Sequence, residues 1–237
     1  MTIGARAASS STGLPRGLFQ ASGLAAVIGT GLAYGFGGMS AALVAAGALG
    51  VVLLLIGLLL PGRYPHARFG LCNLVTLARA ALVAGLIGLL WVGVHGWVVF
   101  AVATLGLALD GVDGWLARKA GLSSAFGARF DMETDAALAL VLAAHVWVAG
   151  MTGAEILILG VMRYVFVLGV WPFPWLSAAL PERFGRKLVC VFQIAALILL
   201  QVPDLPRGVA LMIAWPAVAA LIWSFGRDTL WLLKNRA

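Results

Sequence analysis

Long apolar runs recur along the whole chain, and they constrain its fold more than any other feature. Runs of about eighteen residues or more are each long enough to cross a hydrocarbon core roughly 30 Å thick. Hydrophobic residues make up 62% of the 237 residues and charged residues only 11%, whereas soluble domains are about 45–50% apolar. The sequence therefore excludes a water-soluble fold and predicts an all-α polytopic membrane protein.

Breaks at proline, glycine and charge clusters predict about eight transmembrane helices. The expected spans are residues 19–36, 39–60, 72–95, 97–119, 125–149, 154–175, 186–202 and 208–231. We expect the polar stretch 1–17 to be a cytoplasmic tail and the first two spans to form a transmembrane hairpin over residues 18–60. The many glycines of the first span also allow a re-entrant segment in its place.

The basic residues lie in the short connections between apolar runs, although a net charge of +7 would suggest nucleic acid in a soluble protein. With the N-terminus in the cytoplasm, nearly all of them fall on the cytoplasmic side and only Arg207 falls outside. This is the positive-inside pattern, and it requires an even number of spans. We therefore expect an integral protein of the cytoplasmic (inner) membrane, with membrane lipids and no nucleic acid as partners.

Four aspartates are concentrated at one expected membrane level. Asp110 and Asp113 share a helix face near the cytoplasmic end of the fourth span, and Asp131 and Asp135 share one at the start of the fifth. Because a short connection joins these antiparallel spans, the two pairs can converge on one cavity. Four like charges there need a cation, and hard oxygen ligands suit Mg²⁺, Mn²⁺ or Ca²⁺.

Small and basic residues accompany the aspartates. Gly111, Gly114 and Gly127 leave room for a bulky nucleotide, and Arg118 provides a fixed cation for a diphosphate. Phosphoryl-type transfer is a reaction that needs a carboxylate-bound divalent ion of this kind. The alternative is that the aspartates are solvated interfacial residues and the glycines serve helix packing.

At these residues the sequence resembles the CDP-alcohol phosphotransferase family, whose signature reads D-x2-D-G-x2-A-R-x8-G-x3-D-x3-D. The matching positions are Asp110, Asp113, Gly114, Ala117, Arg118, Gly127, Asp131 and Asp135. The resemblance extends more loosely to a six-helix core over about residues 72–231. Its first helix is similar to the family's N-x-x-T-x-x-R pattern through Asn73, Thr76 and Arg79, although Cys72 replaces the proline that is frequent before the asparagine.

The resemblance implies a six-helix catalytic membrane domain over residues 61–237. In it Asp110, Asp113 and Asp131 hold Mg²⁺ or Mn²⁺, and Asp135 completes the metal site and acts as general base. The implied nucleotide-binding residues are Gly111, Gly114, Ala117, Arg118, Gly127, Asn73 and Thr76. The alcohol would attack the phosphorus distal to cytidine and CMP would leave. The residues alone do not distinguish Asp135 from the other three carboxylates.

Further cations suggest the second substrate. Arg79 and Arg163 lie inside expected spans, where a cation usually faces a cavity or a partner, and Arg183, Arg186 and Lys187 precede the seventh span. If they face the cavity, they favour an anionic acceptor such as a phosphorylated polyol, for example glycerol 3-phosphate. The alternative for the last three is a topology signal that binds lipid head groups.

The apolar chain favours a lipid-linked donor, CDP-diacylglycerol, which would place the enzyme in phospholipid biosynthesis. The sequence leaves open which alcohol is used and whether diacylglycerol belongs to donor or acceptor. Homodimerisation is suggested only by the resemblance. Two other hypotheses are an intramembrane prenyltransferase that binds a diphosphate through Mg²⁺, and a cation transporter with a buried carboxylate site. His66, His95 and His145 lack metal-ligand spacing and are expected to be bystanders.

Overall fold

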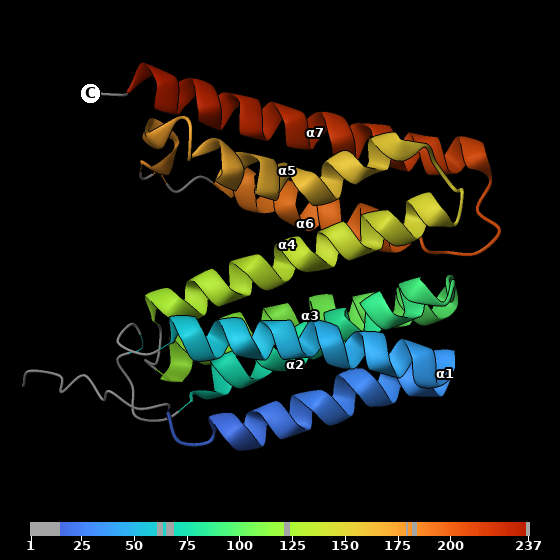
Figure 1. Ribbon diagram of the computed structural model, residues 1–237. Helices are drawn as coiled ribbons and strands as arrows, with labels where there is room; N and C mark the ends of the chain where they lie inside the picture. The colour runs from blue at the N-terminus through green and yellow to red at the C-terminus, as the bar shows by residue number, and fades with distance from the viewer. Residues whose placement is uncertain are drawn as a thin grey trace, which may run out of the picture. The chain divides into compact units, whose positions relative to one another are not determined.

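The structure is a computed structural model that describes residues 15–60, 64, 69–120, 124–178, 180–181 and 184–235, without the side chains of 112–120. Within these ranges the chain is helical and contains no strand (Figure 1). The α-helices are α1 (Leu18–Leu59), α2 (Leu71–Trp91), α3 (Trp97–Ala120), α4 (Ala125–Val148), α5 (Leu157–Gly169), α6 (Phe184–Leu199) and α7 (Arg207–Lys234). Two short 3-10 helices, η1 (Ala154–Ile156) and η2 (Pro174–Ser177), flank α5. The all-α fold class is confirmed.

The helix α1 consists of two arms that fold back on each other at Gly38 (Figure 1). This residue has φ 74° and ψ −165°, a backbone conformation that glycine adopts readily because it has no Cβ. The reversal brings Leu18 of the first arm into one apolar cluster with Ile56 and Leu60 at the far end of the second. The two arms correspond to the expected spans 19–36 and 39–60.

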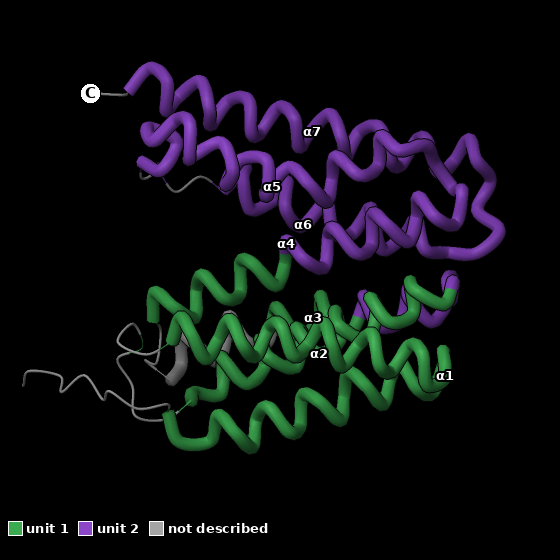
Figure 2. The backbone as a smooth tube through the Cα atoms, viewed as in Figure 1, with its two compact units in different colours: residues 1–92, 105–135 green, residues 93–104, 136–237 purple. Residues whose placement is uncertain are grey.

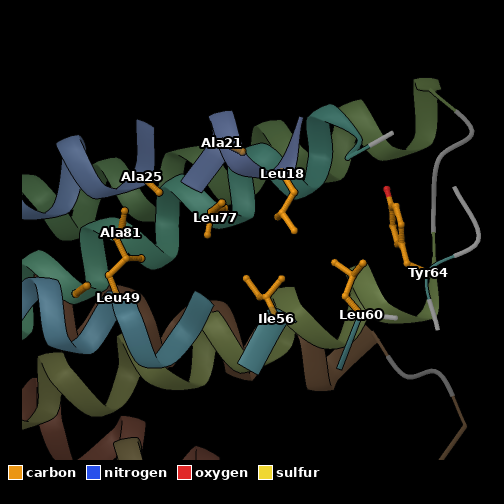
Figure 3. Close-up of a cluster of buried hydrophobic side chains, with 10 residues drawn as sticks. Leu18, Ala21, Ala25, Leu49, Ile56, Leu60, Tyr64, Leu77 and Ala81 are labelled. Carbon is orange, nitrogen blue, oxygen red and sulfur yellow. The ribbon is translucent and has the colours of Figure 1, made fainter. Parts of the chain in front are cut away.

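Small residues allow the hairpin arms to approach α2 closely. A Cβ at Gly29 would lie 2.7 Å from the backbone oxygen of Ala81, and a Cβ at Gly88 would collide with the backbone oxygen of Ala41. Close backbone approach of this kind is typical of membrane helices, where van der Waals packing replaces the hydrophobic driving force. Figure 3 shows the resulting cluster, in which side chains from both arms lie close to Leu77 of α2.

Three of the described helices, α1, α2 and α7, are long and apolar enough to cross a membrane. The apolar part of α3, Trp97–Gly111, is shorter. The polytopic class is therefore confirmed, whereas the number of eight spans stays a prediction.

The chain divides into two compact units (Figure 2). The first comprises residues 1–92 and 105–135, and the second comprises residues 93–104 and 136–237. In the second unit the side-chain amides of two glutamines bond to the backbone of α4 and α5. Gln201 donates from Nε2 to the backbone oxygen of Leu142 at 3.0 Å, and Gln193 donates to that of Leu159. Such bonds satisfy polar groups that the bilayer core cannot solvate.

Candidate functional site

Two helices of the first unit bring acidic side chains to one place. Asp110 lies near the end of the apolar part of α3, and Asp131 and Asp135 lie one turn apart in the first half of α4. One carboxylate oxygen of each residue lies within 4.8 Å of the others. The expected convergence of carboxylates therefore holds for these three, and the side chain of Asp113 lies outside the described part of α3.

Arg79 of α2 lies among these carboxylates. Its Nη1 is 3.0 Å from Oδ1 of Asp110 and 2.5 Å from Oδ1 of Asp131, and its Nη2 contacts Asp135. The side chain of Arg79 is only 2% exposed, so its charge would be costly without these partners. The expected acceptor-binding role of Arg79 stays a prediction, and in the structure its guanidinium lies among the metal-ligand candidates.

The charges and spacing of this cluster fit a divalent cation. Three carboxylates against one guanidinium leave two formal negative charges, which one divalent ion would balance. Two oxygens on opposite sides of an ion, each about 2.1–2.5 Å from it, are roughly 4–5 Å apart. The 4.8 Å limit on the oxygen separations agrees with this spacing. Oxygen ligands without His or Cys suit Mg²⁺ or Mn²⁺.

Two expected nucleotide-binding residues meet beside this cluster. Asn73 of α2 is buried, and a Cβ at Gly127 of α4 would lie only 2.8 Å from its Oδ1. Gly111 of α3 differs, since a Cβ there would meet nothing within 4 Å. The buried Thr76 donates its hydroxyl to the backbone oxygen of Cys72 at 3.0 Å. The remaining expected residues, whose side chains are outside the described part of α3, are Gly114, Ala117 and Arg118.

The other expected acceptor-binding residues lie in the second unit or outside the described chain. The Nε of Arg186 is 2.9 Å from Oδ2 of Asp228, and its Nη2 donates to the backbone oxygen of Pro181 at 3.1 Å. Lys187 is exposed on α6, and Arg163 is half-buried on α5. Arg183 lies outside the described residues.

The sequence analysis did not single out Asp228 or Tyr64. Asp228 is 6% exposed and lies in the apolar helix α7, where a lone carboxylate is by itself a signal of a polar partner. Tyr64 lies in a connection and accepts a hydrogen bond from Asn73, which no sequence pattern indicates.

A further unpredicted contact joins His95 and His145, whose Nδ1 atoms are 3.0 Å apart although fifty residues separate them in sequence. His95 lines a cavity of about 240 Å³ together with Met151, Gln201 and Pro203. Burial lowers the pKa of His95, which lies in the connection between α2 and α3. The pair therefore links this connection to the end of α4.

The helices and the acidic cluster define a polytopic membrane protein with a cluster of carboxylates between its helices. Residues 69–223 match the model of the CDP-alcohol phosphatidyltransferase family, and the chain belongs to this family. It is therefore a membrane transferase of phospholipid biosynthesis that transfers a phosphatidyl group to an alcohol. No solved structure matches the chain. The whole α1 hairpin and Tyr64 precede the matched region.

Proposed function

We propose that this protein transfers the phosphatidyl group of CDP-diacylglycerol to a phosphorylated polyol such as glycerol 3-phosphate and releases CMP. The observation that carries the proposal is the cluster of Asp110, Asp131 and Asp135 around Arg79, in a chain of this family. A net negative, oxygen-lined site suits an enzyme whose donor carries a diphosphate, because a divalent ion can bind carboxylate and phosphate oxygens together.

Asp110, Asp131 and Asp135, with Asp113 by resemblance, would hold Mg²⁺ or Mn²⁺. When bound, such an ion supplies Lewis acidity toward phosphate oxygens and stabilises the charge of the leaving CMP. Arg79 would keep the carboxylates together through the ion pairs that it makes with them. Gly111, Gly127 and Asn73, with Gly114, Ala117, Arg118 and Thr76 by resemblance, would receive the CDP group.

Asp135 would act as the general base. Its side chain is 43% exposed, so an incoming hydroxyl group could reach it. The hydroxyl proton would move to the Asp135 carboxylate as the alcohol oxygen forms a bond to the phosphorus distal to cytidine. The bond between that phosphorus and the bridging oxygen would break, and CMP would leave with the bridging oxygen.

The acceptor would be anionic. Arg163, Arg186 and Lys187, with Arg183, are basic residues of α5 and α6 that could recognise its phosphate. Arg186 already pairs with Asp228, so this carboxylate would hold the guanidinium in place rather than leave it free to move. The active site would face the cytoplasm from the inner membrane, in agreement with the charge bias of the connections. A homodimer stays a prediction of the resemblance.

The test is release of CMP by the purified protein from CDP-diacylglycerol, with Mg²⁺ or Mn²⁺ and a panel of alcohols. We expect CMP and a new phospholipid with glycerol 3-phosphate, and much less of both with neutral polyols. Asp135→Asn should lower the rate at least about a hundredfold, since a general base contributes roughly 10²–10⁴. Glu133→Gln, two residues away on α4, is the matched control and should keep most of the activity.

Three results would contradict this function. CMP release with no acceptor preference would exclude the anionic acceptor, and absence of CMP release with every alcohol would exclude the donor. Release of inorganic pyrophosphate from a prenyl diphosphate under the same conditions would favour the prenyltransferase hypothesis instead.

A further inference from the structure

Tyr64 is a buried aromatic residue that precedes the family match at residues 69–223. Its side chain is 5% exposed and belongs to the apolar cluster that both arms of α1 form with α2 (Figure 3). The ring also meets Phe126 of α4 edge-on, with 6.1 Å between the ring centroids. One side chain therefore contacts the hairpin, the start of α2 and the start of α4.

The hydroxyl group of Tyr64 accepts two hydrogen bonds. Asn73 donates from Nδ2 at 2.9 Å, and the backbone N–H of Gly70 donates at 3.2 Å. Gly70 is the residue before α2, and no side-chain cap is formed there by Gly70 itself. A phenolic oxygen has lone pairs for both donors, so Tyr64 fixes the start of α2 and the amide of Asn73 together.

The other end of the Asn73 amide faces α4. A Cβ added at Gly127 would lie 2.8 Å from Oδ1 of Asn73, so the absence of a side chain at Gly127 is what admits the amide. The N–H of Gly127 donates to Oγ of Ser124 at 3.0 Å, which orders the first turn of α4. With Nδ2 bonded to Tyr64 and Oδ1 against Gly127, the amide plane of Asn73 is held from both sides.

We propose that Tyr64 is a positioning residue for the CDP-linked donor and that its hydroxyl group acts through Asn73. The inference rests on the proposed function, which assigns Asn73 and Gly127 to the donor. Tyr64 would not contact the donor itself. Its ring and its hydroxyl group have separable roles, because the ring packs in the apolar cluster and only the oxygen bonds to Asn73.

The experiment compares Tyr64→Phe, Asn73→Ala and the double variant in the purified full-length protein. Tyr34→Phe is the matched control, since Tyr34 is exposed on α1. The measurements are the KM for CDP-diacylglycerol, the KM for glycerol 3-phosphate and the midpoint of thermal unfolding. We expect Tyr64→Phe to raise the donor KM about two- to tenfold, as for loss of one buried hydrogen bond. The acceptor KM should stay that of Tyr34→Phe, whereas the midpoint should fall modestly, because Tyr64→Phe also removes the acceptor of the buried Gly70 N–H.

Action through Asn73 has a further signature. Asn73→Ala should raise the donor KM at least as much as Tyr64→Phe, and the double variant should be no worse than Asn73→Ala alone. Effects that multiply in the double variant would contradict the proposal. An unchanged donor KM in Tyr64→Phe would also contradict it. A rise in both the donor KM and the acceptor KM of Tyr64→Phe, with a lower midpoint, would mean that the hydroxyl group only stabilises the fold.

The same data separate this inference from the proposed function. If Asn73→Ala raises the donor KM and Tyr64→Phe does not, the result supports the nucleotide-binding role of Asn73 and contradicts the positioning role of Tyr64. If the unmodified protein releases CMP and Asn73→Ala leaves the donor KM unchanged, Asn73 has no role toward the donor and the inference is overturned. If the unmodified protein releases no CMP, the proposed function itself has failed.

Discussion

The guanidinium of Arg79 lies 3.0 Å from the carboxylate of Asp110. Arg79 belongs to α2, the helix against which the hairpin α1 packs. The same group contacts Asp131 and Asp135 of α4, so one buried cation joins three helices at the candidate metal site. It also sets the charge that a metal must balance. The stability of the metal-free protein and its response to metal should therefore depend on Arg79.

Replacing Arg79 with Gln should lower metal-free stability and increase the stabilisation by Mg²⁺. Loss of one partner of a buried ion pair costs about 3–5 kcal/mol, and the exposure of the carboxylates reduces this to roughly 2–3 kcal/mol. Thermal unfolding with and without Mg²⁺ measures both effects. Arg207→Gln, an exposed residue at the start of α7, is the control. An unchanged metal-free midpoint in Arg79→Gln would contradict the account.

The close approach of the hairpin to α2 predicts opposite effects for two glycines of the same arm. Gly29→Ala places a Cβ 2.7 Å from the backbone oxygen of Ala81, so it should destabilise the protein by about 1–3 kcal/mol. Gly31→Ala meets nothing within 4 Å and should be neutral or slightly stabilising, since alanine favours helix. Denaturant unfolding of the purified variants compares them, and equal losses would mean that the hairpin does not pack on α2 as described.

The ion pair of Arg186 and Asp228 predicts a rescue. Arg186→Gln leaves the buried carboxylate of Asp228 only the more distant Arg227, whose Nη2 is 3.9 Å from its Oδ1, and should cost about 1–3 kcal/mol of unfolding free energy. Adding Asp228→Asn should recover most of this loss, because no buried charge remains. The acceptor KM should stay high in both variants if Arg186 recognises the acceptor. Recovery of the acceptor KM together with stability would show that the pair is only structural.

The contact of His95 with His145 predicts a stability that falls with acidification. One Nδ1 must donate to the other across 3.0 Å, so the contact requires at least one neutral ring, and protonation of both rings would place two donors face to face. Burial lowers the pKa of His95 below its ordinary value of about 6.5. The unfolded chain, with the ordinary pKa of about 6.5, therefore binds the proton more readily than the folded protein. The contribution of His95 to stability is complete at pH values above the unfolded pKa. It is lost as the pH falls from there through the lowered pKa of the folded protein.

Thermal midpoints between about pH 5 and pH 8 test this expectation. The unmodified protein should lose more stability toward low pH than His95→Asn, whose amide cannot be protonated in this range. Parallel curves for the two proteins would mean that the histidine contact does not contribute.

Much of the fold could be predicted because a membrane span requires a long apolar run. The limits of the helices were less predictable. The expected span 72–95 ends at Trp91 in the structure, since Gly93 and Gly96 adopt φ values of 74° and 80° that stop a helix. The expected span 154–175 is divided between η1, α5 and the start of η2. Glycine and proline predicted that the helices break in these regions. They did not predict the backbone conformation of each residue, and this conformation decides where a helix ends.

The candidate site shows the same limit. The spacing of Asp110, Asp131 and Asp135 predicted their convergence, because residues one turn apart on adjoining helices share a face. The place of Arg79 was not predictable, since it depends on the rotation of α2 about its axis. That rotation is set by contacts with the hairpin, such as Gly29 against Ala81, which no local pattern records. The pairing of Arg186 with Asp228 likewise depends on how α6 and α7 pack.

Binding of Mn²⁺ by the purified protein, followed by electron paramagnetic resonance, tests the carboxylate site most directly. The unmodified protein should bind Mn²⁺, Mg²⁺ should compete for the site, and Asp131→Asn should weaken binding strongly. Glu133→Gln, in the same turn of α4, should bind as the unmodified protein does. Equal binding by all three proteins, or none by the unmodified one, would contradict a divalent-metal site formed by Asp110, Asp131 and Asp135.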